Sequence, residues 1–173
     1  MKEMEVLGLS EIQPEDIKEE KRVIAFLLNE ELIGINIKNI IKITKKLDIT
    51  PVPKTAEHIM GVMNLRGNIV PVVNIKKMLD LPNADNVDEQ EFILIIDTEL
   101  GNIGLMIDKV VGAITIEDEE IQPAPINSIG IDSRYITGVI VTDEEIGNKS
   151  LLILLDIDKL FHKNEEETEA RAS

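Results

Sequence analysis

The sequence contains no cysteine and no tryptophan, and it has only one tyrosine and two histidines. The absence of cysteine excludes disulfide bonds, thiolate nucleophiles and cysteine metal sites. The two histidines, His58 and His162, are too few for a typical histidine-based zinc site. A Walker-type phosphate loop and an H-E-x-x-H motif are also missing. These absences favour a non-enzymatic protein that needs no cofactor.

Long hydrophobic runs are absent as well. The longest runs, Phe92–Ile96 and Leu151–Leu155, are far too short to span a bilayer, and the first residues show no signal-peptide pattern. We therefore expect a cytoplasmic protein that does not insert into a membrane.

The charge is strongly negative but unevenly distributed. A formal net charge of −15 and a scarcity of stacking aromatics argue against nucleic-acid binding. Residues 38–77 nevertheless carry only two acids, Asp48 and Glu57, against eight basic side chains: Lys38, Lys42, Lys45, Lys46, Lys54, Arg66, Lys76 and Lys77. Such a basic patch on an acidic body can orient a charged partner. Ordinary solvated lysines would give the same pattern, so both interpretations stay open.

The hydrophobic content is aliphatic and suits β-structure. Apolar residues make up 43% of the chain, and 29 of them are isoleucine, a β-branched residue that favours strands. Residues 1–20 and 164–173 are acidic or polar and are expected to be disordered tails. The folded body is expected to span residues 21–163.

The body contains an internal repeat. Four pairs of segments align with apolar on apolar at most positions and in the same order: Gly34–Ile41 with Gly104–Val111, Ile49–Pro53 with Ile121–Pro125, His58–Val62 with Tyr135–Val139, and Ile69–Leu79 with Leu151–Phe161. The offset grows from 70 to 82 residues along the chain, as loop insertions would produce. We therefore expect two copies of one supersecondary unit.

Each copy has the pattern of a small β-domain. Apolar segments separated by turn residues predict hairpins, and Asn74 and Asp156 are placed to cap a short helix at the end of each copy. About five strands per copy favour closure into a small barrel, because closure removes exposed edges. We predict an all-β protein of two small five-stranded barrels, with units at about 22–85 and 90–163 that either stay separate or exchange strands. A groove is expected between the barrels.

Two features stand out as candidate contact sites. One face of a strand cannot hold all of four closely spaced isoleucines, Ile37, Ile40, Ile41 and Ile43. Some of these side chains must therefore point out of their own barrel. They either join the two barrels together or leave part of a docking groove open for a partner helix. Arg66 is predicted at a hairpin tip, where it is either an ordinary turn residue or a fork of hydrogen-bond donors for a partner.

Taken together, these segments resemble the CheW family. The segment Gly61-Val-Met-Asn-Leu-Arg-Gly-Asn-Ile-Val-Pro-Val-Val-Asn resembles the family's central motif, and flanking segments fit in the same order over residues 22–162. The resemblance implies two SH3-like β-barrels without catalytic activity. It also implies an adaptor of the chemotaxis signal-transduction scaffold, which links the cytoplasmic hairpin tips of methyl-accepting chemoreceptors to the regulatory domain of the histidine kinase CheA.

The resemblance also assigns contact residues by position. The receptor-binding groove would comprise Ile24, Ile37, Ile40, Ile43, Arg66, Val110 and Val111. The kinase-binding surface would draw on Ile41, Lys42, Gln122, Ile126 and Asn127. Lys42 stands where the family commonly has Glu, so the charge at this position is opposite to that of the family. The alternative function is a small-ligand-binding sensor that uses the groove between the barrels, although few polar and titratable groups converge there.

Overall fold

The isoleucine-rich runs form β-strands, as their β-branched side chains predict. The computed structural model describes residues 21–87, 90–124, 130–146 and 149–162. The two predicted tails, residues 1–20 and 164–173, lie outside the described residues. Within the described ranges, no helix is both long and apolar enough to cross a membrane.

The order of elements repeats along the chain. The first half contains β1 (Lys21–Leu28), β2 (Glu31–Asn36), the 3-10 turn η3 (Ile37–Asn39), β3 (Ile40–Lys45), β4 (Ile59–Leu65), β5 (Asn68–Asn74) and helix α1 (Ile75–Met78). The second half contains β6 (Phe92–Thr98), β7 (Gly101–Ile107), β8 (Lys109–Ile116), η5 (Asp118–Glu120), η6 (Ser133–Tyr135), β9 (Ile136–Ile146), β10 (Lys149–Leu155) and helix α2 (Ile157–Leu160). The predicted all-β class and the internal repeat are confirmed.

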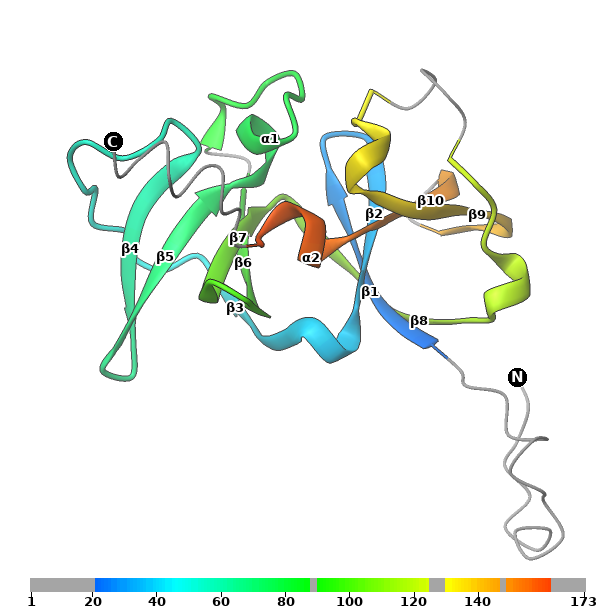
Figure 1. Ribbon diagram of the computed structural model, residues 1–173, viewed down its shortest axis with the longest axis horizontal. Coiled ribbons are helices and arrows are strands. Elements are labelled where there is room, and N and C mark those ends of the chain that lie inside the picture. The colour runs from blue at the N-terminus through cyan, green and yellow to red at the C-terminus, as the bar shows by residue number, and fades with distance from the viewer. Residues whose placement is uncertain (1–20, 88–89, 125–129, 147–148, 163–173) are drawn as a thin grey trace, which may run out of the picture.

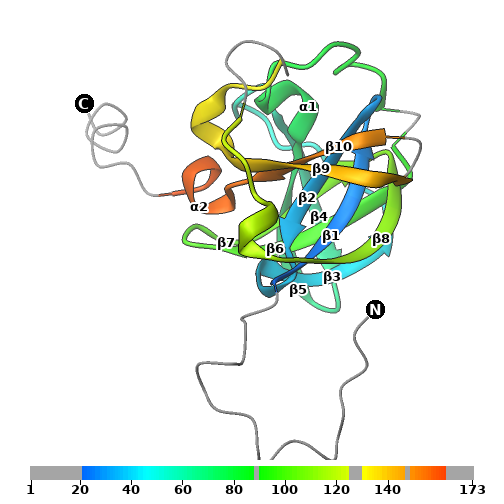
Figure 2. The same ribbon diagram turned by 90° about the vertical axis from the view of Figure 1, so that its right-hand side faces the viewer.

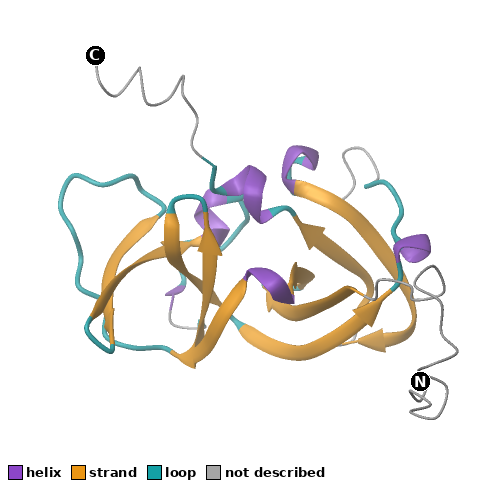
Figure 3. Cartoon of the chain, turned by 60° about the horizontal axis from the view of Figure 1, so that its bottom comes forward, coloured by secondary structure: helices purple, strands orange, loops and turns teal. Residues whose placement is uncertain are grey.

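The strands form two five-stranded sheets, and the labels in Figure 1 show that strands of both repeats enter each sheet. Figure 3 shows the same strands from below. One sheet, barrel A, has the order β8-β1-β2-β10-β9, and the other, barrel B, has the order β3-β6-β7-β5-β4. Two isolated bridges help to close the sheets into barrels. Gln122 pairs with Val139 on β9, an edge strand of barrel A, and Thr50 pairs with Val62 on β4, an edge strand of barrel B. Each barrel therefore combines strands from both halves of the chain.

Equivalent residues of the two repeats occupy equivalent places in the two barrels. Leu154 of β10 pairs in parallel with Gly34 of β2, and Val72 of β5 pairs in parallel with Gly104 of β7. The caps also correspond, because the side chain of Asn74 accepts a hydrogen bond from the Lys77 N–H while Asp156 accepts one from the Lys159 N–H. Both predicted caps are confirmed.

The core has three parts that follow from strand alternation. Every second residue of β1, such as Val23 and Ala25, faces the interior of barrel A. Ile93 and Ile95 of β6 likewise face the interior of barrel B. The alternate residues, including Phe26 and the equivalent strand residues of β2, β6 and β7, form a central core between the barrels. These central strands are apolar on both faces because both faces are buried.

Candidate functional site

At one end of the central core, apolar side chains are only half-buried. We define the inter-barrel surface as Ile37, Ile40, Ile43 and Val110, which all pack against the central core while keeping part of their area exposed. Residues that lie opposite each other in an antiparallel pair share a face. Ile43 lies opposite Leu94, and Val110 lies opposite Phe26. Both partners belong to the central core, so the surface is the outer edge of that core.

The η3 turn crosses between the barrels at this end of the molecule (Figure 1). It contacts both β1 of barrel A and β6 of barrel B. The Asn36 side chain holds the turn by accepting a hydrogen bond from the Lys38 N–H at 3.0 Å. Ile37 lies in this turn and packs against the central core between the barrels. Ile24, another predicted groove residue, is only 8% exposed and contributes mainly to the central core beneath this surface.

Three exposed cations border the inter-barrel surface. Arg22 of β1 lies two residues before Ile24 and opposite Thr115, so it shares the inward face of Ile24. Lys45 of β3 lies opposite Phe92, a residue packed against the central core. Lys38 is exposed on η3. Sequence reasoning missed Arg22, because its place depends on the pairing of β1 with β8, which no local pattern predicts.

Ile41 and Val111 occupy equivalent bulges in the two repeats. The register of β3 against β6 shifts between Ile40 and Lys42, and the register of β8 against β1 shifts in the same way. Ile41 is 51% exposed, whereas Val111 packs against the interior cluster of barrel A. Of the two predicted contact residues, Ile41 offers the larger apolar surface, and a partner contact at Val111 stays a prediction.

Arg66 lies at the tip of the β4–β5 hairpin, on different elements from the inter-barrel surface. Its φ of 51° and the φ of 87° at Gly67 form the turn, and the Gly67 N–H donates to Asn64 Oδ1 at 2.8 Å. Positive φ angles at both central residues are typical of a type I′ turn, whose twist matches that of the flanking strands. The Arg66 side chain is exposed and has no ion pair or hydrogen bond with another described residue.

The predicted kinase-binding residues divide between the barrels. Ile41 and Lys42 lie on β3 of barrel B, whereas Gln122 is exposed beside β9 of barrel A. The other two, Ile126 and Asn127, lie outside the described residues.

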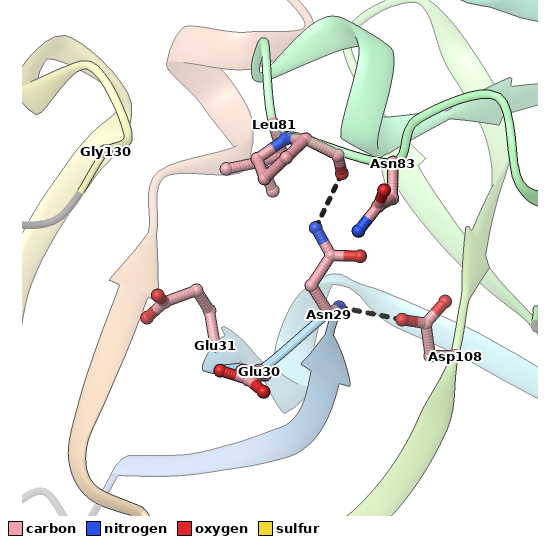
Figure 4. Close-up of a pocket in the computed structure, with 8 residues that line it drawn as sticks. Asn29, Glu30, Glu31, Leu81, Asn83, Asp108 and Gly130 are labelled. Atoms are coloured by element: carbon pink, nitrogen blue, oxygen red, sulfur yellow. Dashed lines mark hydrogen bonds between the residues drawn. The ribbon is translucent and has the colours of Figure 1, made fainter.

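A polar connection joins the barrels at the opposite end of the central core. Asn29, in the β1–β2 turn, donates its main-chain N–H to Asp108 Oδ2 at 2.7 Å and its side-chain amide to the Pro82 carbonyl at 2.7 Å (Figure 4). Lys76 of α1 is fully buried, and its Nζ lies 2.8 Å from Asp108 Oδ1. Asn29, Pro82 and Asp108 line part of a pocket of about 470 Å³ that is also lined by Glu30 and Glu31.

A second charged group lies on η6, beside the end of α1. The Arg134 guanidinium lies 3.0 Å from Asp132 Oδ2 and 5.2 Å from the Tyr135 ring centre. The main-chain and side-chain hydrogen bonds from Arg134 lower the pKa of the Asp132 carboxyl, and the same carboxylate raises the pKa of Arg134. Among the described residues, no group of three His, Cys, Asp or Glu side chains is arranged to hold a metal ion.

We compared the sequence and structure of the chain with those of known proteins, and the matches point to one family. The family model described as "CheW-like domain" matches residues 22–165. The chain is 33% identical to "Chemotaxis protein CheW" of Treponema pallidum over 85% of each sequence. It is also 33% identical to the Thermotoga maritima protein of that name, over 86% of this chain and 92% of the relative. The crystal structure of "scaffolding protein TtCheW" from Thermoanaerobacter tengcongensis superposes with a TM-score of 0.71 at 32% identity, covering 83% of this chain and 94% of that one. The chain belongs to the CheW-like domain family.

Proposed function

We propose that this protein is a non-enzymatic cytoplasmic adaptor that couples chemoreceptor hairpin tips to the histidine kinase CheA in a receptor-associated array. The names of its relatives support a role in chemotaxis, and the solved relative, a scaffolding protein, supports a scaffolding role. The observation that carries the proposal is the half-buried apolar edge of the central core, because a partner is needed to complete its burial.

The receptor contact is the inter-barrel surface together with Arg22, Lys38 and Lys45. An amphipathic helix would place apolar anchors on Ile40 and Ile43 and acidic residues beside the cations. Each apolar side chain of the partner helix that passes from exposed to fully buried contributes about 1.5–3 kcal/mol to binding, before the entropic cost of association. A few such anchors suffice for a modest affinity.

The kinase contact draws on two groups of residues. Ile41 and Lys42 supply one contact, and Gln122 with Ile126 and Asn127 supplies another. Because Ile41 and Lys42 lie on barrel B and Gln122 lies beside β9 of barrel A, the kinase meets them at two places. Binding two partners through separate surfaces raises the effective concentration of kinase near receptor without any chemical step.

Two adjacent isoleucines provide the test. Ile40 packs against the central core, whereas Ile41 is the exposed bulge residue beside it. We expect Ile40→Asp to abolish binding of a receptor-tip hairpin while keeping kinase binding, and Ile41→Asp to do the reverse. Calorimetric titration of the full chain with each partner separately measures both effects. Because Ile40→Asp changes a half-buried position, Ile40→Thr and a thermal unfolding curve of each variant serve as folding controls.

Failure of the unmodified protein to bind either partner at high micromolar concentration would remove the proposal. Equal loss of both partners in well-folded variants would show that the surfaces are not separate. The small-ligand alternative is tested by a thermal-shift screen with nucleotides and metabolites, in which a large reproducible stabilisation would favour a sensor.

A further inference from the structure

The three cations beside the inter-barrel surface have no acidic partner in the described part of the chain. Arg22, Lys38 and Lys45 are exposed, and no ion pair connects them to a described carboxylate. By contrast, Lys21, beside Arg22, lies 3.0 Å from Asp118. The surface therefore combines unburied apolar area with uncompensated positive charge, and it fits a segment that is both acidic and apolar.

Residues 1–20 have this composition. They contain seven acidic residues against two lysines, and their apolar residues, Val6, Leu7, Leu9, Ile12 and Ile17, alternate with acidic clusters. This charge is opposite to that of the inter-barrel surface and equal in sign to that of most of the remaining protein. Charge complementarity therefore directs these residues to a basic, apolar region near their attachment point.

The attachment point lies beside the inter-barrel surface. Residue 20 connects directly to Lys21, the first residue of β1, and Arg22 already shares the face of the central core. The start of β1 and η3 lie at the same end of the molecule in two perpendicular views (Figures 1 and 2). An extended chain covers at most about 3.3 Å per residue, so the connection from Ile12 to Lys21 can span up to about 30 Å.

We propose that residues 1–20 bind intramolecularly to the inter-barrel surface, with apolar residues on Ile40 and Ile43 and carboxylates beside Arg22, Lys38 and Lys45. The short connection gives the segment a millimolar effective concentration, so a weak contact is enough to populate the bound state. The attraction between exposed charges weakens as salt is added.

The absence of cysteine allows a direct test in the full chain, because Ser10→Cys creates a single site for a nitroxide label. Methyl spectra of isoleucine report which side chains lie near the label. We expect strong paramagnetic broadening of the Ile40 and Ile43 methyls, and little at Ile69 on the β4–β5 hairpin. Ile116, which pairs with Lys21, controls for simple proximity to the attachment point.

A variant without the three cations tests whether their charge causes the contact. The combined changes Arg22→Gln, Lys38→Gln and Lys45→Gln remove the cations, whereas Lys109→Gln removes a cation on β8 that lies opposite Leu27, on the other face of the strand. We expect the triple variant, or 1 M salt with a Debye length of about 3 Å, to restore the Ile40 and Ile43 signals. The Lys109→Gln protein keeps the broadening.

Three results would overturn the inference. Broadening confined to Ile116 and its neighbours would show that the label samples only the attachment point. Broadening that the triple variant leaves unchanged would exclude the charge contact. Broadening of an unlabelled, isotope-enriched chain by an added nitroxide-labelled chain would show a contact between copies in place of the intramolecular one.

Competition with a receptor is a consequence that rests on the proposed function. A segment bound for two-thirds of the time lowers the apparent affinity for a receptor hairpin about threefold. Replacing Glu3, Glu5 and Glu11 with Gln is expected to recover this factor. Because the nitroxide experiment contains no receptor, a failure of receptor binding leaves the intramolecular contact separately testable.

Discussion

Lys76 Nζ lies 2.8 Å from Asp108 Oδ1, and the lysine side chain is completely buried. The same carboxylate accepts the main-chain N–H of Asn29 from the other barrel. Asp108 therefore connects α1 of barrel B to the β1–β2 turn of barrel A. A buried ion pair adds little net stability, but removing one partner leaves an uncompensated charge. We infer that this pair fixes the orientation of the two barrels.

The first prediction concerns this buried pair. We expect Lys76→Met to lower the free energy of unfolding by about 3 kcal/mol, because Asp108 would remain mostly buried without a counter-ion. The matched control is Lys77→Met, which removes an ion pair to the exposed Asp85 and is expected to cost less than about 1 kcal/mol. Urea denaturation measures both. Equal costs for the two variants would contradict a special role for Lys76.

The second prediction separates backbone from side chain at Asn29, whose φ is 56°. Asn29→Gly keeps the backbone conformation and loses only the hydrogen bond to Pro82, at a cost of about 1 kcal/mol. Asn29→Ala adds the cost of placing a Cβ in the left-handed region, about 1–2 kcal/mol more. Thermal or urea unfolding gives the order of stability as wild type, Gly, then Ala. An alanine variant as stable as the glycine variant would show that the turn relaxes.

The third prediction concerns Gly61 and Gly138, which are equivalent in the two repeats. A Cβ at Gly61 would meet the main chain of Thr50, and one at Gly138 would meet the main chain of Gln122. Both neighbours form the bridges between the sheet edges. Gly101 also has a positive φ, but a Cβ there meets no atom within 4 Å. We expect Gly61→Ala to be less stable than Gly101→Ala by about 1–3 kcal/mol in denaturant titrations. A smaller difference would mean that the bridge moves easily.

The fourth prediction concerns the pKa of Asp132. The main-chain N–H of Arg134 is the largest cause of the lowered pKa, and the guanidinium hydrogen bond is the next. Arg134→Gln therefore removes only part of the shift, and a carboxyl NMR titration should place the pKa between its native and ordinary values. A lowered carboxyl pKa favours the folded state above the unfolded pKa, and this contribution is lost as the pH falls through the folded pKa. A full return to the ordinary pKa would show that the main-chain bond contributes nothing.

Local features of this fold could be predicted from the sequence. The hairpins, both helix caps and the repeat rest on turn residues, capping residues and alternation, which act within a few positions. The equivalence of Asn74 and Asp156 is confirmed because Asn74 ends β5, Asp156 follows β10, and each is the N-cap of the short helix that comes next.

Non-local features could not be predicted. The sequence leaves an exchange of strands open, because nothing near Gly34 indicates that β2 pairs with β10. The candidate site also depends on contacts between segments that are far apart in the sequence. Lys76 belongs to the basic segment by sequence, yet it is buried against Asp108, because burial depends on a partner from the other repeat. Arg22 joins the inter-barrel surface for the same kind of reason.

The last prediction concerns the cations around the inter-barrel surface and depends on the proposed receptor contact. Exposed ion pairs contribute about 0.2–1 kcal/mol each, so the triple change of Arg22, Lys38 and Lys45 to Gln should weaken receptor-hairpin binding by about 0.6–3 kcal/mol at low salt. Removing boundary charges mainly slows association, so surface plasmon resonance should show a reduced association rate and a smaller dependence on salt. Lys109→Gln is the matched control. It also removes one positive charge, but Lys109 lies on the face of β8 that points away from the inter-barrel surface. If Lys109→Gln lowered the association rate as much per charge as the triple variant, the effect would come from overall charge, and Arg22, Lys38 and Lys45 would have no directed role.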